Sequence, residues 1–232
     1  MTILTHSLAF FIGIVYPMYF LFTYKKTQFK LKTDNNYRLV DYKQTITLFW
    51  FLTILVIGVS FTKQSIDLNF YPEFNPIGII LSILILIFII LQIASSKVST
   101  SEKAEIVLKK IRDNYHYLPK TKKEFIWFNI LSISAGFCEE IIFRLFLFSY
   151  LFEHTHIIIA FVLTNLVFAI THIGSSKQNI IGAFFLGLLF SAIYYFTNNI
   201  WLSIILHSAI DINIGILGYK TYTFSKKNKL VL

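Results

Sequence analysis

The sequence predicts an all-α polytopic transmembrane bundle of about seven to eight helices, and three observations support this class. The 232 residues are 56% hydrophobic and 18% aromatic, and only 14% are charged. A water-soluble domain of this length does not need so much apolar residue to bury a core. The apolar residues gather in segments that approach or reach the roughly 20 residues of a membrane-spanning helix. The basic residues concentrate in alternate loops between these segments.

Seven apolar segments are expected to cross the bilayer. In chain order they are residues 3–23, 45–62, 77–95, 125–151, 157–173, 180–197 and 199–219. The first has no basic segment before it and no cleavage motif after it, so we expect a retained helix rather than a signal peptide. Between the third and fourth segments, residues 99–114 have the pattern of an amphipathic helix at the membrane surface. No linker or repeat divides the chain, so residues 1–232 are expected to form a single membrane domain.

The basic residues predict how the chain is oriented. Of the 21 lysines and arginines, 19 lie in the loops after the first, third and fifth segments and in the tail after the seventh. Lys63 is the one basic residue in an opposite loop. The positive-inside rule therefore puts the N-terminus outside and the C-terminus in the cytoplasm, in a multi-pass protein of the plasma membrane. The net charge of +9 is then explained by the anionic lipid bilayer as partner, and no nucleic acid is implied.

Ionisable residues also lie inside the predicted spans, where they are costly. The residues concerned are Glu139, Glu140, Arg144, Asp211, His172 and His207. Such residues usually face the interior of the bundle, pair with one another and mark a functional site. A structural ion pair that locks helices together is the alternative explanation.

The spacing of these residues predicts which of them meet. Glu140 and Arg144 are four residues apart and can pair on one helix face. Glu139 is rotated by about 100° from Glu140, so its carboxylate is left for another role, such as that of a general base. His207 and Asp211 are again four residues apart. Since residues 165, 168 and 172 also share one face, three spans each present a polar stripe, and helix bundles build sites in this way.

Three motifs occur in order on these apolar spans. EEIIFR at 139–144 fits EExxxR, FAITH at 168–172 fits FxxxH, and HSAID at 207–211 fits HxxxN/D. In these motifs residues 124–214 resemble the CPBP family, the intramembrane CAAX-protease and bacteriocin-processing (Abi) group, and we take this stretch as the catalytic core. The resemblance implies hydrolysis of peptide bonds on the cytoplasmic side of the membrane. It leaves open whether the substrate is a lipidated CAAX protein, a peptide pheromone or a bacteriocin precursor.

The resemblance also implies roles for single residues. Glu139 activates a water molecule, His172 helps to hold it, and His207 and Asp211 stabilise the oxyanion. Asp211 departs from the commoner asparagine, and only its neutral form can donate a hydrogen bond to an oxyanion. Four further residues of the same spans are expected to support the site: Glu140, Arg144, Phe168 and Asn165.

The sequence leaves the question of a metal open. Glu139, His172 and His207 could hold Zn²⁺ with one open position for water. However, the chain has no HExxH motif, and Arg144 beside the glutamates disfavours a dication. The sequence therefore favours a metal-free site in which a glutamate activates water.

Other functions use the same residues. The Glu, His and Asp side chains could form an ion or proton relay in a transporter. A catalytically silent immunity or scaffold protein is a third reading. Cys138, the single cysteine, could serve as a nucleophile, although a small buried apolar residue is the simpler interpretation. Counting along straight helices places His172 nearer the cytoplasm than Glu139, so a bend or break at residues 132–136 is expected to lower Glu139.

Overall fold

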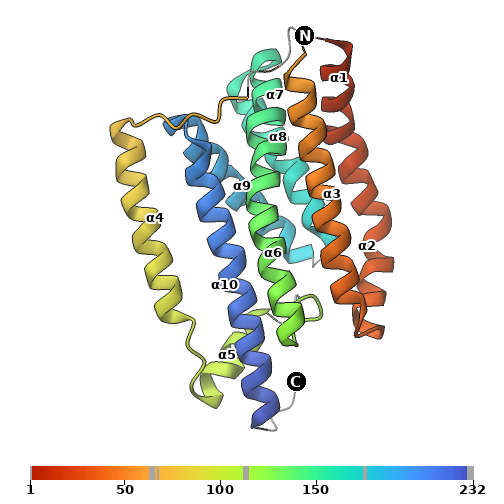
Figure 1. The fold of residues 1–232 in the computed structure, drawn as a ribbon, viewed down its shortest axis with the longest axis vertical. Helices are drawn as coiled ribbons and strands as arrows, with labels where there is room; N and C mark the ends of the chain where they lie inside the picture. The colour runs from red at the N-terminus through yellow and green to blue at the C-terminus, as the bar shows by residue number, and fades with distance from the viewer. Residues whose placement is uncertain (1, 63–65, 67, 112–114, 175–176, 229–232) are drawn as a thin grey trace.

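The computed structural model describes residues 2–62, 66, 68–111, 115–174 and 177–228. In these parts of the chain all regular secondary structure is helical. The helices run roughly parallel to the long axis of the molecule (Figure 1). An all-helical bundle was predicted, and the structure confirms this class.

The N-terminal helix is long and changes its geometry on the way. It consists of α1 (Ile3–Phe10), a π-helical turn η1 (Phe11–Val15) and α2 (Tyr16–Thr33). Thr2 caps its start by accepting a hydrogen bond from the amide of Thr5. A short turn then leads into α3 (Tyr37–Ser60), which returns along the bundle beside α2 (Figure 1).

Helix α4 (Pro76–Ser95) lies at the edge of the bundle (Figure 1). Asn75 caps it, and proline at its first position suits a helix start. Of the α4 residues only Gly78 and Ile85 are buried, which fits a helix that presents most of its surface to lipid. The short α5 (Ser101–Ile111) packs beside the C-terminal part of α10, within the stretch expected to form a surface helix.

The helix that carries the first motif is continuous from Lys122 to His154. It consists of α6 (Lys122–Glu139), the π-helical η3 (Glu140–Phe148) and α7 (Ser149–His154). Thr121 and Glu124 form a capping box at its start. The expected break at residues 132–136 is wrong, since α6 runs through them as a regular helix. The departure from α-helical geometry begins at Glu140 instead.

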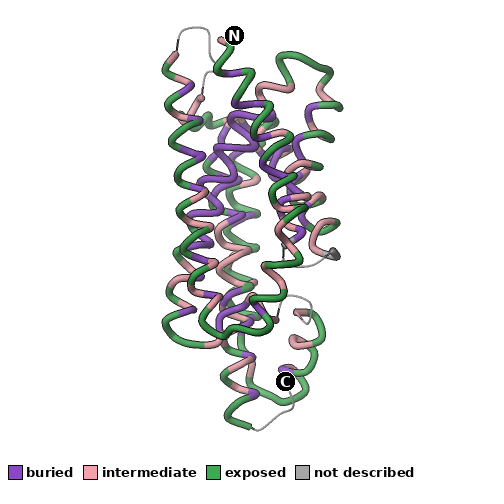
Figure 2. The backbone as a smooth tube through the Cα atoms, turned by 90° about the vertical axis from the view of Figure 1, so that its right-hand side faces the viewer, coloured by how far each residue is buried: buried purple, intermediate pink, exposed green. Residues whose placement is uncertain are grey.

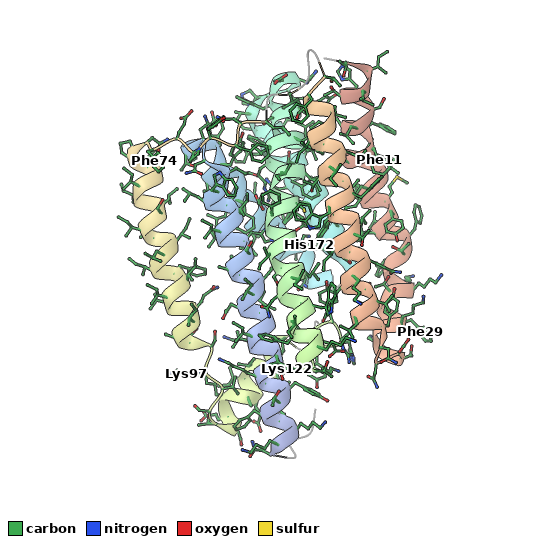
Figure 3. All side chains as sticks on the ribbon, viewed as in Figure 1. Phe11, Phe29, Phe74, Lys97, Lys122 and His172 are labelled. Atoms are coloured by element: carbon green, nitrogen blue, oxygen red, sulfur yellow. The ribbon has the colours of Figure 1, made fainter. Side chains whose placement is uncertain are left out.

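The depth of His172 is set by the length of its own helix. Helix α8 (Ile157–Thr171) has 15 residues and is followed by the 3-10 turn η4 (His172–Gly174). Fifteen residues span about 22 Å, less than the roughly 30 Å of a hydrocarbon core. The chain therefore turns back at about half the height of the bundle, where Figure 3 labels His172. This places His172 in the interior without lowering Glu139.

Two long helices complete the bundle, α9 (Lys177–Thr197) and α10 (Ile200–Lys227). Between them the chain turns at Asn198, which has a positive φ of 48°. Asn199 then caps α10 by accepting from the amide of Trp201. The two chain ends lie at opposite ends of the bundle (Figure 1).

Among the described residues, five helices are long and apolar enough to cross a membrane. They are Ile3–Thr33, Tyr37–Ser60, Pro76–Ser95, Asn179–Thr197 and Ile200–Lys227. The two other predicted spans correspond to the charged helix from α6 to α7 and to the shorter apolar α8. The protein is thus a multi-pass membrane protein.

The basic loops follow the predicted pattern where the structure describes them. The ends of α2, α4 and α10 and the start of α6 share the lower end of the bundle (Figure 1). Lys63, Arg112 and Lys229 lie outside the described residues, and of Lys177 only the backbone is described. That this end faces the cytoplasm stays a prediction.

The buried residues concentrate in the middle and upper part of the bundle (Figure 2). Helix α6 packs between α3 and α10, while α8 packs against α9. Every residue of η3 is buried, including Glu140 and Arg144. The most polar stretch of the sequence motifs therefore lies in the most buried part of the molecule.

Candidate active site

One imidazole brings the first and third motifs together. His207 donates its Nδ1–H to Oε1 of Glu140 over 2.8 Å. Its Nε2 lies 3.6 Å from Oε2 of Glu139 and 3.6 Å from Oδ2 of Asp211. The carboxyl groups of Glu139, Glu140 and Asp211 thus surround a single histidine ring. Asp211 is distant in sequence from the two glutamates, and a regular helix would point the glutamates apart.

The change in helix geometry at Glu140 helps to explain why both glutamates reach this ring. Glu139 ends the α-helical stretch and Glu140 begins the π-helical one. A π-helix is wider than an α-helix and is often found at functional sites. Two consecutive side chains, which an α-helix would point about 100° apart, here both contact His207.

Close contact between α6 and α10 sets the distance between the two motifs. A Cβ atom on Gly136 would lie 2.1 Å from the hydroxyl oxygen of Ser208 and 2.8 Å from its backbone nitrogen. Gly136 is one turn before Glu140, and Ser208 follows His207. Glycine at this position therefore lets the two helices approach closely enough for Glu140 to bond His207.

Arg144 joins three elements around Glu140. Its Nη1 donates to Oε1 of Glu140 over 3.2 Å, so the predicted pair is present. Its Nη2 donates to Oδ1 of Asn165 over 3.3 Å and to the backbone carbonyl of Gly187 over 3.1 Å. A Cβ on Gly187 would lie 2.5 Å from Asn165 and 3.2 Å from Arg144, so this contact also requires glycine.

Aromatic rings enclose the charged groups. The guanidinium carbon of Arg144 lies 4.3 Å from the ring centre of Phe168 and 5.4 Å from that of Phe190. Phe190 also stacks on His207, with ring centres 4.9 Å apart and an interplanar angle of 17°. These contacts stabilise the cation and fix the plane of the imidazole.

Three residues that hold these groups were not predicted from the sequence: Ser191, Ser203 and Phe190. Ser191 accepts a hydrogen bond from Nδ2 of Asn165 over 3.0 Å. Ser203 donates to the backbone carbonyl of Phe190 over 3.0 Å, which ties α10 to α9. A serine or phenylalanine in an apolar helix carries no distinguishing pattern.

His172 reaches the site through Phe168. Its Nδ1 donates to the backbone carbonyl of Phe168 over 2.9 Å, so in the neutral ring Nε2 is the hydrogen-bond acceptor. The ring of Phe168 lies 4.5 Å from that of His172 and 6.0 Å from that of His207. The three motifs thus lie in one region of the bundle, with Phe168 between the two histidines.

Asp211 is the most accessible carboxyl group of the site. Its side chain is 33% exposed, whereas those of Glu139 and His207 are 5% exposed. Glu140 and Arg144 are fully buried. Asp211 is therefore the carboxyl group of the site nearest to the surface of the bundle, while the glutamates lie deeper.

That the site works without zinc stays a prediction, which the charges around the donor set favour. In the described part of the chain, no three His, Cys, Asp or Glu side chains form a group that could hold a metal ion. Glu140 is already engaged by the positive charge of Arg144, and His207 uses its Nδ1 for the same carboxylate. Cys138 is fully buried in the apolar core.

Comparison with known proteins agrees with the motifs. Residues 121–213 match the family model described as Rce1-like, type II CAAX prenyl endopeptidase Rce1-like. This range contains all three motifs. A search of curated proteins found no match, and neither did a search of solved structures. Residues 121–213 are thus similar to the Rce1-like type II CAAX prenyl endopeptidase family, which is consistent with the CPBP resemblance of the three motifs.

Proposed function

We propose that this protein is an intramembrane endopeptidase in which Glu139 activates the water that hydrolyses a peptide bond. The substrates are membrane-associated or lipidated peptides or protein C-termini. The observation that carries the proposal is the position of His207, whose two nitrogens lie within 3.6 Å of Glu139, Glu140 and Asp211. Groups that converge in this way can act on the same reacting atoms, which a hydrolase requires.

In the first step Glu139 is the general base. Its carboxylate takes a proton from water, and the resulting hydroxide attacks the carbonyl carbon of the scissile peptide bond. In the neutral ring, Nε2 of His172 accepts a hydrogen bond and so helps to orient this water. Burial strengthens these interactions because little solvent competes with them.

In the second step the oxygen of the former carbonyl carries a negative charge. In its protonated form His207 can donate from Nε2 while its Nδ1–H remains bonded to Glu140. Asp211 supplies a further hydrogen bond in its neutral form. Donors placed before the reaction stabilise such an oxyanion strongly.

In the last step the carbon–nitrogen bond breaks and the amine leaves. It receives the proton that Glu139 took from water, so Glu139 returns to its carboxylate form. The net reaction converts a peptide bond and water into a carboxylic acid and an amine, and one proton transfer between these products gives a carboxylate and an ammonium group. Arg144 does not react in this scheme, since it fixes Glu140, which fixes His207.

The same geometry argues against the alternative function, an ion or proton relay in a transporter. A proton or ion path across a bilayer needs groups at successive depths. Here Glu139, Glu140 and Asp211 surround one ring, and His172 is separated from that ring by a single aromatic side chain. We place the access past Asp211 toward the basic end of the bundle, which we assign to the cytoplasm of a plasma-membrane protein.

The experiment compares purified wild type with Glu139→Gln in detergent. The probes are a fluorogenic peptide ending in a prenylated cysteine motif, the same peptide without the lipid, and an unlipidated leader-type peptide. We expect wild type to cleave at least one probe and Glu139→Gln to lose about 10² to 10⁴ in rate with an unchanged melting temperature. Glu153→Gln, which changes an exposed glutamate of α7, is the matched control and should stay active.

Full activity of Glu139→Gln would overturn the assignment of the base. If wild type cleaves none of the probes, while proteoliposomes show proton uptake that depends on Glu139, the protein is a relay rather than a protease. The lipidated and unlipidated probes also separate CAAX-type from leader-type processing.

A further inference from the structure

Tyr16, in the N-terminal helix, has a buried hydroxyl group that the mechanism above does not use. The residue is 3% exposed and lies in the main hydrophobic core. Its hydroxyl oxygen has no hydrogen-bond partner among the residues that the structure describes. Its ring makes an edge-to-face contact with that of Phe20, with ring centres 5.1 Å apart.

Such a hydroxyl group is unusual because it loses its hydrogen bonds to water and gains none in return. Unpartnered buried polar groups are rare in folded proteins, and those that occur often have a functional reason. Threonine and serine can turn back to a carbonyl of their own helix. The hydroxyl of tyrosine is too far from its own backbone to do so, which leaves only groups of neighbouring elements as partners.

Among the described orphan hydroxyls, that of Tyr16 stands out by its surroundings. Tyr16 belongs to the same cluster of buried side chains as Cys138, the residue before Glu139, and Phe168 of the second motif. Helix α2 packs against α8 and against η4, the turn that begins with His172. Tyr16 therefore lies on the side of the site formed by the first two motifs.

The local geometry of the N-terminal helix fits a functional position. The π-helical turn η1 ends at Val15, directly before Tyr16, and Pro17 follows. Turn η1 itself packs against η3, the π-helical segment that begins with Glu140. Two π-helical segments, one in each half of the chain, thus pack against each other, and such segments are frequent at functional sites.

We propose that Tyr16 is a further catalytic residue, whose hydroxyl hydrogen-bonds the reacting atoms beside Glu139. This inference deepens the proposed function and rests on it. It gives a catalytic contribution to the N-terminal helix, which lies outside the family match at residues 121–213. The hydroxyl donates to the oxygen of the attacked carbonyl or to the water that Glu139 deprotonates. In both cases its partner is supplied by the reaction itself.

The test is Tyr16→Phe, which removes only the hydroxyl oxygen. We expect kcat to fall at least tenfold, KM to change less than twofold, and the melting temperature in detergent to stay the same or rise. Stability is kept because the lost group had no partner in the resting protein. Wild type and Glu139→Gln are assayed in parallel on the same cleaved probe.

Thr221→Val is the matched control. Thr221 is also fully buried with an unpartnered hydroxyl, but it lies ten residues after Asp211 on α10, about 15 Å along the helix. Valine has the same shape as threonine. We expect this variant to keep the wild-type kcat, so a loss of kcat that is confined to Tyr16→Phe marks the tyrosine hydroxyl as specific.

Three outcomes would overturn the inference while leaving the proposed function intact, provided that wild type cleaves and Glu139→Gln does not. These are a wild-type kcat in Tyr16→Phe, a rise in KM alone, or a lower kcat with a melting temperature reduced by several degrees. The last would show a structural role for the hydroxyl. If wild type itself cleaves no probe, the proposed function fails and the role of Tyr16 fails with it.

Discussion

Gly136 on α6 faces Ser208 on α10 so closely that a methyl group on residue 136 would lie 2.1 Å from the serine hydroxyl oxygen. The contact lies one helical turn from Glu140 and next to His207. It joins the helix of the first motif to that of the third at the point where their side chains meet. The bond between Glu140 and His207 at 2.8 Å therefore depends on a residue with no side chain.

Gly136→Ala is expected to lower stability by about 1–3 kcal/mol, the usual result of adding a methyl group to a well-packed core. It should also lower activity, because α10 must move away from α6. Melting temperature and peptide cleavage measure the two effects. Gly182→Ala is the control, since a Cβ at Gly182 has no neighbour within 4 Å. Alanine favours a helix over glycine, so that variant should be neutral or slightly stabilised. Equal melting temperatures for both variants would contradict the close contact.

Arg144→Ala is expected to destabilise the protein more than Glu140→Ala. Loss of the arginine leaves Glu140 buried without its cation, and stranding a buried charge costs about 3–5 kcal/mol. In Glu140→Ala, Arg144 still donates to Asn165 and to the Gly187 carbonyl. Denaturation in detergent gives the order of stability. Arg144→Lys should not restore stability, because a lysine cannot reach three acceptors with a planar fork. A melting temperature of Arg144→Ala equal to that of wild type would contradict the burial of this pair.

Asp211→Asn is expected to keep at least the wild-type activity. The amide of asparagine donates a hydrogen bond at any pH, whereas aspartate does so only when protonated. Asp211→Leu has a similar size but no donor, so its kcat should fall by about 10²-fold or more, as is typical for the loss of one oxyanion donor. Steady-state kinetics on the cleaved probe give the kcat of both variants. An inactive Asp211→Asn together with an active Asp211→Leu would remove Asp211 from the mechanism.

Dialysis against a strong chelator is expected to leave cleavage intact, and metal analysis should find well under one zinc per chain. The reason is the donor set, in which Arg144 occupies Glu140 and the carboxylates surround a histidine that already has a partner. Added Zn²⁺ should therefore not raise the rate. Stoichiometric zinc that is lost together with activity, and restores it when added back, would reverse this assignment.

The contacts that could be predicted from the sequence are those between charged residues spaced one turn apart on a helix. Glu140 and Arg144 are four residues apart and pair as expected. His207 and Asp211 share a face of α10 and lie 3.6 Å apart. These contacts follow from the periodicity of a helix, and charged residues in an apolar span are conspicuous.

Other parts of the site have no such signal. Phe190 packs on His207, yet it is one apolar residue among many on α9. The π-helical geometry after Glu139 depends on how η3 packs against its neighbours, so a periodicity of 3.6 residues does not reveal it. The depth of His172 was misjudged for a similar reason, since hydropathy locates an apolar segment but not the height at which its helix ends.

The shortness of α8 has a consequence for how the protein is made. An apolar helix of 15 residues does not cross a bilayer by its own hydrophobicity. Helix α8 therefore holds its depth by contacts with α2 and α9, which exist only once the bundle has assembled. A nascent chain can carry all its motifs and still lack His172 at the right height. We expect hydrolytic competence to arise at the end of membrane assembly, so that partly inserted chains do not cleave their neighbours.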